Sequence, residues 1–183
     1  MTTITNPGST RYLEIDRPDG SVGRIAFDDQ GSGPVVLLAP GMGTTRATFR
    51  HLVPLLLVAG YRVVTTDYRG LGESDTGWAE YSSAVTADDL AALIRHLDAG
   101  PVLLYSNSYT SASSVHIAAD HPELLRGAVF AGPVAAAAAM RAVGALVAVF
   151  EPSPLLAITW IRAVLPWSPL ANLYVCCVAP GIA

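Results

Sequence analysis

Short apolar runs alternate with stretches of helical periodicity along the first 133 residues of the chain. The apolar and β-branched runs, bounded by Gly, Pro and Asp, predict strands at residues 11–16, 23–28, 35–39, 61–66, 102–105 and 125–130. Helices are predicted at residues 49–59, from residue 86 up to Gly100, and at residues 109–119. Strands that alternate with helices pair in parallel through right-handed crossovers. The order therefore predicts an α/β fold, with a mostly parallel sheet and helices on both faces.

The clearest helical signal begins at Thr86. Its hydroxyl is suited to cap free backbone N–H groups, and Asp88 and Asp89 favour the positive end of a helix dipole. The apolar residues that share one helix face are Ala87, Leu90, Ala91, Ile94 and Leu97. We therefore predict a helix that starts at Thr86 and packs this face on the sheet.

The pattern becomes helical after Gly132-Pro133, and prolines break it into pieces. We interpret residues 1–133 as the core domain and residues 134–183 as a partial, cap-like helical segment with an uncertain C-terminal tail. Within that tail, residues 173–178 are strand-like and could add one more strand to the sheet.

Charge is sparse in the last 50 residues, which carry only Arg141, Glu151 and Arg162. A membrane span needs about 20 mostly apolar residues. Arg141 and Gly144 interrupt the longest apolar stretch, so no span is expected. A membrane-associated helical tail remains an alternative to helices that are buried against the core.

Composition narrows the function classes further. The net charge is −4, and all eleven basic residues are scattered arginines, so no nucleic-acid partner is expected. The two cysteines, Cys176 and Cys177, are adjacent, and they form neither a disulfide framework nor a zinc site. The N-terminus lacks the profile of a signal peptide. We expect a cytoplasmic protein without metal or cofactor.

Three segments follow predicted strands, where ligands gather in such sheets. They are Pro40-Gly41-Met42-Gly43, Asp67-Tyr68-Arg69-Gly70-Leu71-Gly72-Glu73-Ser74 and Ser106-Asn107-Ser108-Tyr109-Thr110. Their order and contexts resemble the α/β-hydrolase family over about residues 11–133. The middle segment is similar to the family's D-x-R-G-x-G-x-S stretch. The resemblance gives that stretch a mainly structural role, in which Asp67 and Arg69 hold loops in place.

Ser108 stands at the bend of a strand–turn–helix, the nucleophile position of the family's G-x-S-x-G motif. The flanks here are Ser106 and Thr110 instead of Gly, and Thr110 is a bulky departure. By the same resemblance, the backbone N–H groups of Met42 and Tyr109 form the oxyanion hole. The alternative for Ser108 is a Ser-rich helix entry without chemistry.

A base for Ser108 is missing from the expected place. The family order is Ser, then Asp or Glu, then His, but only His116 and His121 follow Ser108. His116 lies about 12 Å further along the same predicted helix. The chain has no Lys, which rules out a Ser–Lys pair. We expect a C-terminally truncated family member, because too few residues follow Phe150 for further units of about 30 residues each.

The sequence thus leaves two functions open. One is an α/β-hydrolase-type serine hydrolase that acts on an ester or similar small molecule, with doubtful competence in this chain. The Ser at the bend argues against the family's dehalogenase and epoxide-hydrolase branches, which by resemblance use Asp there. The other is a non-catalytic remnant or interaction protein. In either case we expect self-association through exposed apolar surface.

Overall fold

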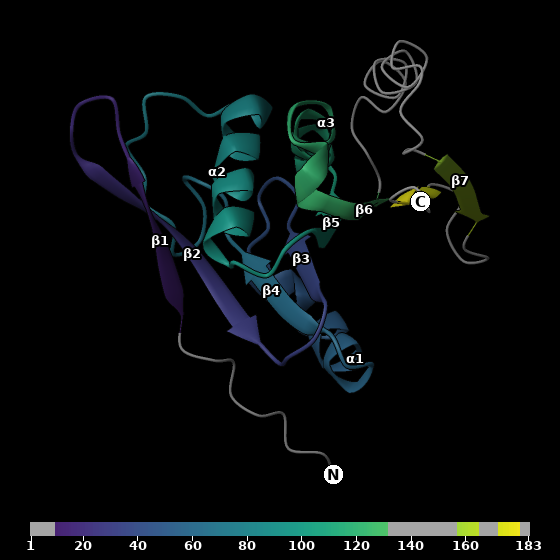
Figure 1. The fold of residues 1–183 in the computed structure, drawn as a ribbon. Coiled ribbons are helices and arrows are strands. Elements are labelled where there is room, and N and C mark those ends of the chain that lie inside the picture. The colour runs from purple at the N-terminus through teal and green to yellow at the C-terminus, as the bar shows by residue number, and fades with distance from the viewer. Residues whose placement is uncertain (1–9, 132–156, 165–171, 180–183) are drawn as a thin grey trace.

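An eight-stranded sheet forms the centre of the computed structural model, which describes residues 10–131, 157–164 and 172–179 (Figure 1). The strands are β1 (Arg11–Asp16), β2 (Val22–Gln30), β3 (Val35–Ala39), β4 (Arg62–Thr66), β5 (Val102–Asn107), β6 (Leu125–Ala131), β7 (Ala157–Val164) and β8 (Asn172–Ala179). Their order in the sheet is β1-β2-β4-β3-β5-β6-β8-β7. The central strands β4, β3, β5 and β6 are parallel, and the flanking strands pair antiparallel.

Helices cover both faces of this sheet. Helix α1 (Leu52–Val58) lies on one face, and α2 (Ser83–His96) and α3 (Tyr109–Asp120) lie on the other (Figure 1). The short 3-10 helices η1 (Arg46–Phe49) and η2 (Pro122–Leu124) precede α1 and β6. The predicted α/β fold, mostly parallel with helices on both faces, is confirmed.

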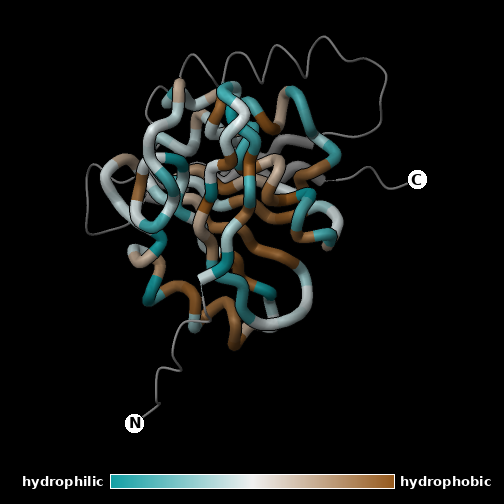
Figure 2. Tube along the Cα trace, turned by 90° about the vertical axis from the view of Figure 1, so that its left-hand side faces the viewer, coloured by the Kyte–Doolittle hydropathy of each residue, from teal (hydrophilic) through white to brown (hydrophobic). Residues whose placement is uncertain are grey.

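Strand β3 shows why the core has two halves. Its five residues are all buried, because successive side chains of a strand point to opposite faces. Val36 and Leu38 pack toward α1, whereas Leu37 and Ala39 pack toward α2 and α3. Hydrophobic positions accordingly follow the central strands and extend to α1, at the lower end of the view in Figure 2.

Two predicted helix boundaries were wrong. The predicted helix at residues 49–59 is shorter, since α1 spans Leu52–Val58. Pro54 explains the late start, because a proline is tolerated in the first turn of a helix but not in its interior. Helix α2 starts at Ser83 and not at Thr86, because the Ser82 hydroxyl accepts from the Val85 backbone N–H at 3.3 Å and caps the helix.

The prediction of helical structure after Pro133 was wrong for residues 157–164. Residues Ala157–Val164 form β7, which pairs with β8, and β8 pairs with β6. The β7 sequence AITWIRAV is rich in β-branched and aromatic residues, which favour strands over helices. The strand-like residues 173–178 lie within β8. Residues 134–156, 165–171 and 180–183 of the proposed cap-like segment lie outside the described residues.

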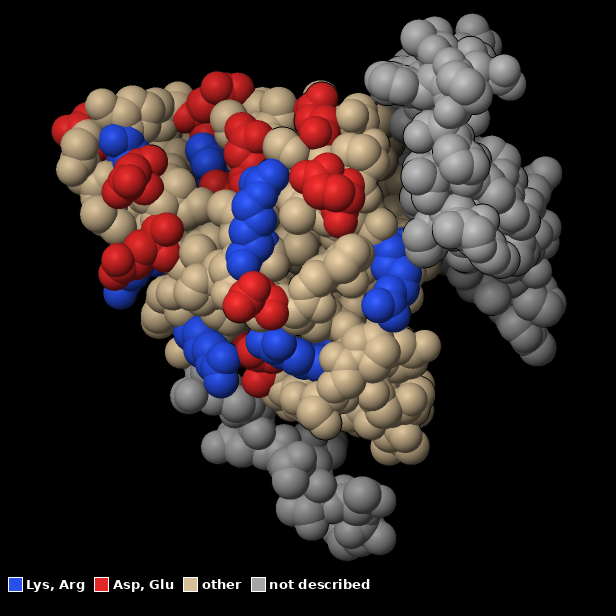
Figure 3. Space-filling view, viewed as in Figure 1, with Lys and Arg blue, Asp and Glu red and all other residues tan. Residues whose placement is uncertain are grey.

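Among the residues that the structure describes, no helix is both long enough and apolar enough to cross a membrane. On the face shown in Figure 3, acidic and arginine side chains are interspersed.

Candidate active site

Ser108 lies at a sharp turn between β5 and α3. Its φ of 52° and ψ of −111° are rarely adopted by a residue with a side chain, and Asp98 is the one other described non-glycine residue with positive φ. The turn is held by the Ser108 backbone N–H, which donates to the Ala131 carbonyl at 2.9 Å, at the end of β6. A strained backbone of this kind costs about 1–3 kcal/mol and persists only where its surroundings enforce it.

The two flanks of the turn are buried and hydrogen-bonded. The Ser106 hydroxyl donates to the Val129 carbonyl at 3.1 Å. The Thr110 hydroxyl accepts from the Asn107 backbone N–H at 3.1 Å and lies 3.0 Å from the Ala39 carbonyl oxygen, an acceptor on β3. Thr110 is therefore compatible with the sharp bend, although the family motif has Gly at this position.

The loop after β3 contacts Ser108 directly through Gly41. A Cβ at Gly41 would lie 3.2 Å from the Ser108 Cβ and 3.4 Å from the Asn107 carbonyl oxygen, so a side chain there would push the loop away. The Thr44 backbone N–H and hydroxyl both donate to the Gly41 carbonyl, which closes a tight turn. Between them, Met42 is 71% exposed. The structure thus brings the predicted oxyanion loop beside the predicted nucleophile.

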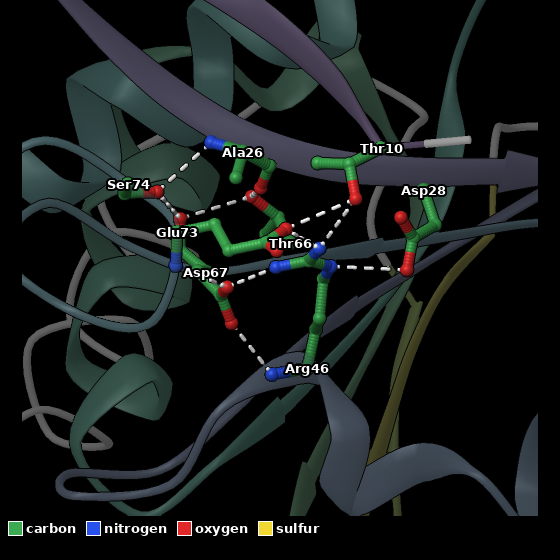
Figure 4. Close-up of polar contacts among 8 residues, drawn as sticks. All are labelled: Thr10, Ala26, Asp28, Arg46, Thr66, Asp67, Glu73 and Ser74. Atoms are coloured by element: carbon green, nitrogen blue, oxygen red, sulfur yellow. Dashed lines mark hydrogen bonds and ion pairs between the residues drawn. The ribbon is translucent and has the colours of Figure 1, made fainter. Parts of the chain in front are cut away.

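Asp67, at the end of β4, is fully buried and is the centre of a polar cluster (Figure 4). Its carboxylate accepts from the Arg46 backbone N–H at 2.7 Å, from the Arg46 guanidinium, and from the Glu73 backbone N–H at 3.1 Å. A side chain at Gly72, which has φ of 57°, would collide with this carboxylate. Asp67 therefore joins the η1 segment to the loop after β4.

Arg46 is enclosed by acidic groups in the same cluster. Its guanidinium donates to Asp28 at 3.0 Å and also contacts Asp67 and Glu73. Burial lowers the pKa of Arg46, but hydrogen bonds to Glu73 and Asp28 outweigh burial and raise this pKa above its usual range. The Arg46 hydrogen bond likewise lowers the pKa of Glu73. The raised pKa of Arg46 and the lowered pKa of Glu73 both favour the charged forms of this pair, so the cluster is suited to hold loops, not to transfer protons.

Ser74 and Arg69 complete the structural role of residues 67–74. The Ser74 hydroxyl donates to the Asp67 carbonyl at 2.7 Å and accepts from the Ala26 backbone N–H on β2. The Arg69 guanidinium donates twice to Asp89 of α2, at 2.7 and 2.6 Å. This segment ties β2, η1 and α2 to the end of β4.

None of the four histidines is placed to act as a base for Ser108. His116 Nε2 lies 3.5 Å from the Ser83 hydroxyl, and His121 Nδ1 lies 3.6 Å from Glu123. The His96 ring packs edge-on against Phe27, and His51 precedes α1. All four lie in the part of the chain that the structure describes, and none forms a hydrogen bond with Ser108.

Comparison with known proteins decides the family. The model described as "alpha/beta hydrolase fold" matches residues 34–165, which is most of the chain. The chain belongs to the α/β-hydrolase family.

Relatives within this family have several activities. The chain is 36% identical over 110 residues to the 2-(acetamidomethylene)succinate hydrolase of Mesorhizobium japonicum, covering 59% of this chain and 39% of that protein. A bromoperoxidase structure from Bacillus anthracis is similar with a TM-score of 0.63 at 28% identity, over 68% of this chain and 45% of the other. A thermophilic esterase structure from Thermogutta terrifontis has a TM-score of 0.62 at 28% identity, and the match covers 68% of this chain and 46% of the esterase. The chain spans about two fifths of the length of the curated relatives it matches.

Sequence reasoning missed three side chains that shape this α/β-hydrolase site. Arg46 does not stand in a recognisable sequence motif, and its partner Asp67 is 21 residues away. Thr86 was predicted to cap a helix, yet it is fully buried and its hydroxyl lies 3.2 Å from the Tyr109 hydroxyl. Tyr68 was quoted only as part of a motif, but its ring packs on that of Tyr109, with ring centroids 5.3 Å apart. Only the proximity of Tyr68 to the motif glycines could have drawn attention to it.

Proposed function

We propose that Ser108 is the nucleophile of a serine hydrolase that cleaves an ester or similar small carbonyl substrate. The observation that carries this proposal is the Ser108 backbone, held at positive φ between β5 and α3 with Gly41 packed against its side chain. Such a turn exposes a hydroxyl at the carboxyl edge of the sheet, which is the nucleophile elbow of α/β-hydrolases.

The reaction would start with the Ser108 hydroxyl. The Ser108 oxygen forms a bond to the substrate carbonyl carbon, and the hydroxyl proton passes to a base. The electron pair of the carbonyl double bond moves onto the carbonyl oxygen, which gives a tetrahedral intermediate. Collapse of this intermediate breaks the bond to the leaving alcohol, which takes up the proton. Water then repeats the sequence on the acyl-enzyme and frees the acid.

The negative charge that develops on the carbonyl oxygen needs donors. We assign this role to the backbone N–H groups of Met42 and Tyr109. Tyr109 is the first residue of α3, so its N–H is free of an intrahelical partner and lies at the positive end of the helix dipole. Removal of one such donor typically costs 10²–10³-fold in rate, about 2.7–4 kcal/mol.

The class of substrate follows from the serine itself together with the relatives. A hydroxyl nucleophile forms an acyl-enzyme with esters and related carbonyl compounds. The similarity to a hydrolase and to an esterase structure supports this class. We propose a small-molecule substrate, without a metal or cofactor.

A non-catalytic interaction protein is the second candidate, and the histidine positions favour it. All four histidines lie among the described residues, and none of them contacts Ser108, so no histidine of this chain is placed to accept the Ser108 proton. A serine without a side-chain base reacts slowly.

Release of p-nitrophenol from a short-chain p-nitrophenyl ester separates the two candidates. The full chain should release at least one equivalent of p-nitrophenol, and Ser108→Ala should release none above background. Ser83→Ala is a matched control, because it removes a partly buried serine hydroxyl on α2 that lies beside His116 and not at the Ser108 turn. Equal release by wild type and Ser108→Ala would reject the hydrolase and favour the interaction protein.

A further inference from the structure

The turn that carries Ser108 is held from both of the strands that neighbour β5. On the β6 side, the Ser108 backbone N–H donates to the Ala131 carbonyl at 2.9 Å. On the β3 side, the Thr110 hydroxyl lies 3.0 Å from the Ala39 carbonyl oxygen. The β3 side bears on catalysis, because the loop that carries one of the proposed oxyanion donors leaves the sheet there.

Backbone pairing between β3 and β5 ends at Ala39, which pairs with Ser106. Pro40 follows, and a proline has no backbone N–H with which to continue the ladder. The chain then turns, since the Gly41 carbonyl accepts from the Thr44 backbone N–H at 3.2 Å. The contact of the Thr110 hydroxyl with Ala39 therefore lies at the point where the sheet stops holding the two segments together.

The same hydroxyl also closes the turn on itself. It accepts from the Asn107 backbone N–H at 3.1 Å and lies 3.1 Å from the Asn107 carbonyl oxygen. A hydroxyl has one proton, which the nearby carbonyl oxygens of Ala39 and Asn107 share. Thr110 is completely buried near the start of α3. One buried oxygen atom thus links the end of β5, the end of β3 and the first turn of α3.

The separation that this contact helps to set is small. A Cβ on Gly41 would lie 3.2 Å from the Ser108 Cβ, so the loop after β3 and the turn pack together with no room for a side chain. Oxyanion donors act only when they are held about 2.7–3.1 Å from the position of the charged oxygen. A turn that is loosened from the end of β3 would move Ser108 relative to the Met42 N–H and weaken this donor.

We propose that Thr110 is a positioning residue, whose hydroxyl fixes the Ser108 turn against the end of β3 and so sets the distance between Ser108 and the loop with Met42. In the family's G-x-S-x-G motif this position is Gly, which has no side chain to make such a contact. The role of Thr110 rests on the proposed nucleophile, Ser108. Thr110 acts through backbone atoms and does not touch the reacting atoms.

Two substitutions separate the hydroxyl of Thr110 from its shape. Thr110→Val keeps the shape and removes the hydroxyl, and Thr110→Ser keeps the hydroxyl and removes the methyl group. Thr66→Val is the matched control. Thr66 is also fully buried, and its hydroxyl lies 3.0 Å from the Ala26 carbonyl oxygen and 3.2 Å from that of Asp67, but these carbonyls belong to β2 and to the residue after β4.

The first measurement is the rate at which a fluorophosphonate labels Ser108 in the full chain, since the phosphonyl oxygen occupies the oxyanion position. Thr110→Val should lower the maximal labelling rate about 3- to 10-fold, the effect of one lost hydrogen bond, and leave the half-saturating probe concentration unchanged. Thr110→Ser should retain most of the wild-type rate. Thr66→Val should match the wild-type rate, although it also loses stability in urea.

Two results of this measurement would overturn the positioning role. One is a Thr110→Val variant that is labelled as fast as wild type. The other is an equal loss of rate in Thr66→Val, which would trace the effect to general destabilisation. Either result leaves Ser108 as the proposed nucleophile, whereas an unlabelled wild-type chain rejects Ser108 and with it any catalytic role for Thr110.

The second measurement is hydrogen exchange of the Asn107 amide, which needs no reactivity. Thr110→Val should accelerate this exchange about 3- to 10-fold relative to Thr66→Val, and Thr110→Ser should not. Unchanged exchange in Thr110→Val overturns the contact. Faster exchange without slower labelling shows that the hydroxyl holds the turn but does not position Ser108, and it overturns the proposal.

Discussion

At the scale of single residues, Thr110 shows how a bulky residue fits a bend where the family motif has Gly. The side chain is completely buried, and its hydroxyl lies within hydrogen-bond distance of backbone atoms from both β5 and β3. The sequence alone suggested a weaker match to the motif, because bulk is visible in a sequence and a hydrogen bond across 71 residues is not.

Thr110→Val should therefore destabilise the protein. Valine has nearly the same shape, but it leaves the partly buried Asn107 N–H without this acceptor, which costs about 1 kcal/mol or more. Urea unfolding of both proteins measures the loss. Thr48→Val, at an exposed threonine, is the control and should change little. A Thr110→Val variant as stable as wild type would show that these hydrogen bonds do not support the turn.

Asp29 is a second residue with a structural role, because its side chain links its own strand β2 to β1 and β4. Its carboxylate accepts from Arg62 of β4 at 2.9 and 2.8 Å and from Arg11 of β1 at 2.9 Å. The Arg62 hydrogen bond lowers the pKa of Asp29, and burial only partly opposes it. A lowered folded pKa means that the carboxylate stabilises the fold above its unfolded pKa, near 3.9. That contribution is lost as the pH falls through the folded pKa.

Asp29→Asn should therefore be less stable than wild type at pH 7, by about 1 kcal/mol or more. The gap should narrow as the pH falls below about 4, because the unfolded wild-type chain then takes up a proton on Asp29 more readily than the folded chain does. Urea midpoints of both proteins at pH 7 and pH 3 measure the two gaps. A gap of the same size at both pH values would contradict the assigned role of Asp29.

At the scale of elements, strand boundaries were easier to predict than helix starts. Strands β1 and β3 coincide with the predicted residues 11–16 and 35–39, because turn residues bound both apolar runs. Helix α2 begins three residues before the predicted start. Ser82 and Thr86 are both good caps in isolation, and only the packing of Thr86 against Tyr109 shows which of them is inside the helix.

Ser82→Ala should accordingly weaken α2. Loss of the cap on the Val85 N–H is expected to cost about 1 kcal/mol. The free energy of unfolding in urea provides the measurement, and Ser83→Ala, one residue into the helix, is the control. If Thr86 were the true cap, Ser82→Ala would leave stability unchanged.

At the scale of the whole molecule, the family was predictable because three segments that follow strands resemble the family's motifs, in the family's order. Their convergence is visible in the structure, where Gly41 lies against Ser108 and Tyr68 against Tyr109. The contacts that hold the site could not be predicted. The Arg46–Asp67 pair joins residues far apart in sequence, and any of eleven arginines could have filled that place. Apolar residues after Pro133 fit a helix or a strand equally well.

The described surface also carries exposed apolar side chains. On α1, Leu55 is 67% and Val58 is 89% exposed. We therefore predict self-association at micromolar concentrations, and a shift toward monomer in the Leu55→Glu/Val58→Glu double variant. Sedimentation velocity measures both. A wild-type protein that sediments as a single monomeric species would contradict this prediction.

The central claim is that this α/β-hydrolase chain presents Ser108 as a nucleophile. Peptide mapping by mass spectrometry after incubation with a fluorophosphonate tests it most directly, because phosphonylation needs no deacylation step. The account predicts one adduct, on the peptide that contains Ser108, and no adduct in Ser108→Ala. An unlabelled wild-type chain, or an adduct that persists in Ser108→Ala, would contradict it.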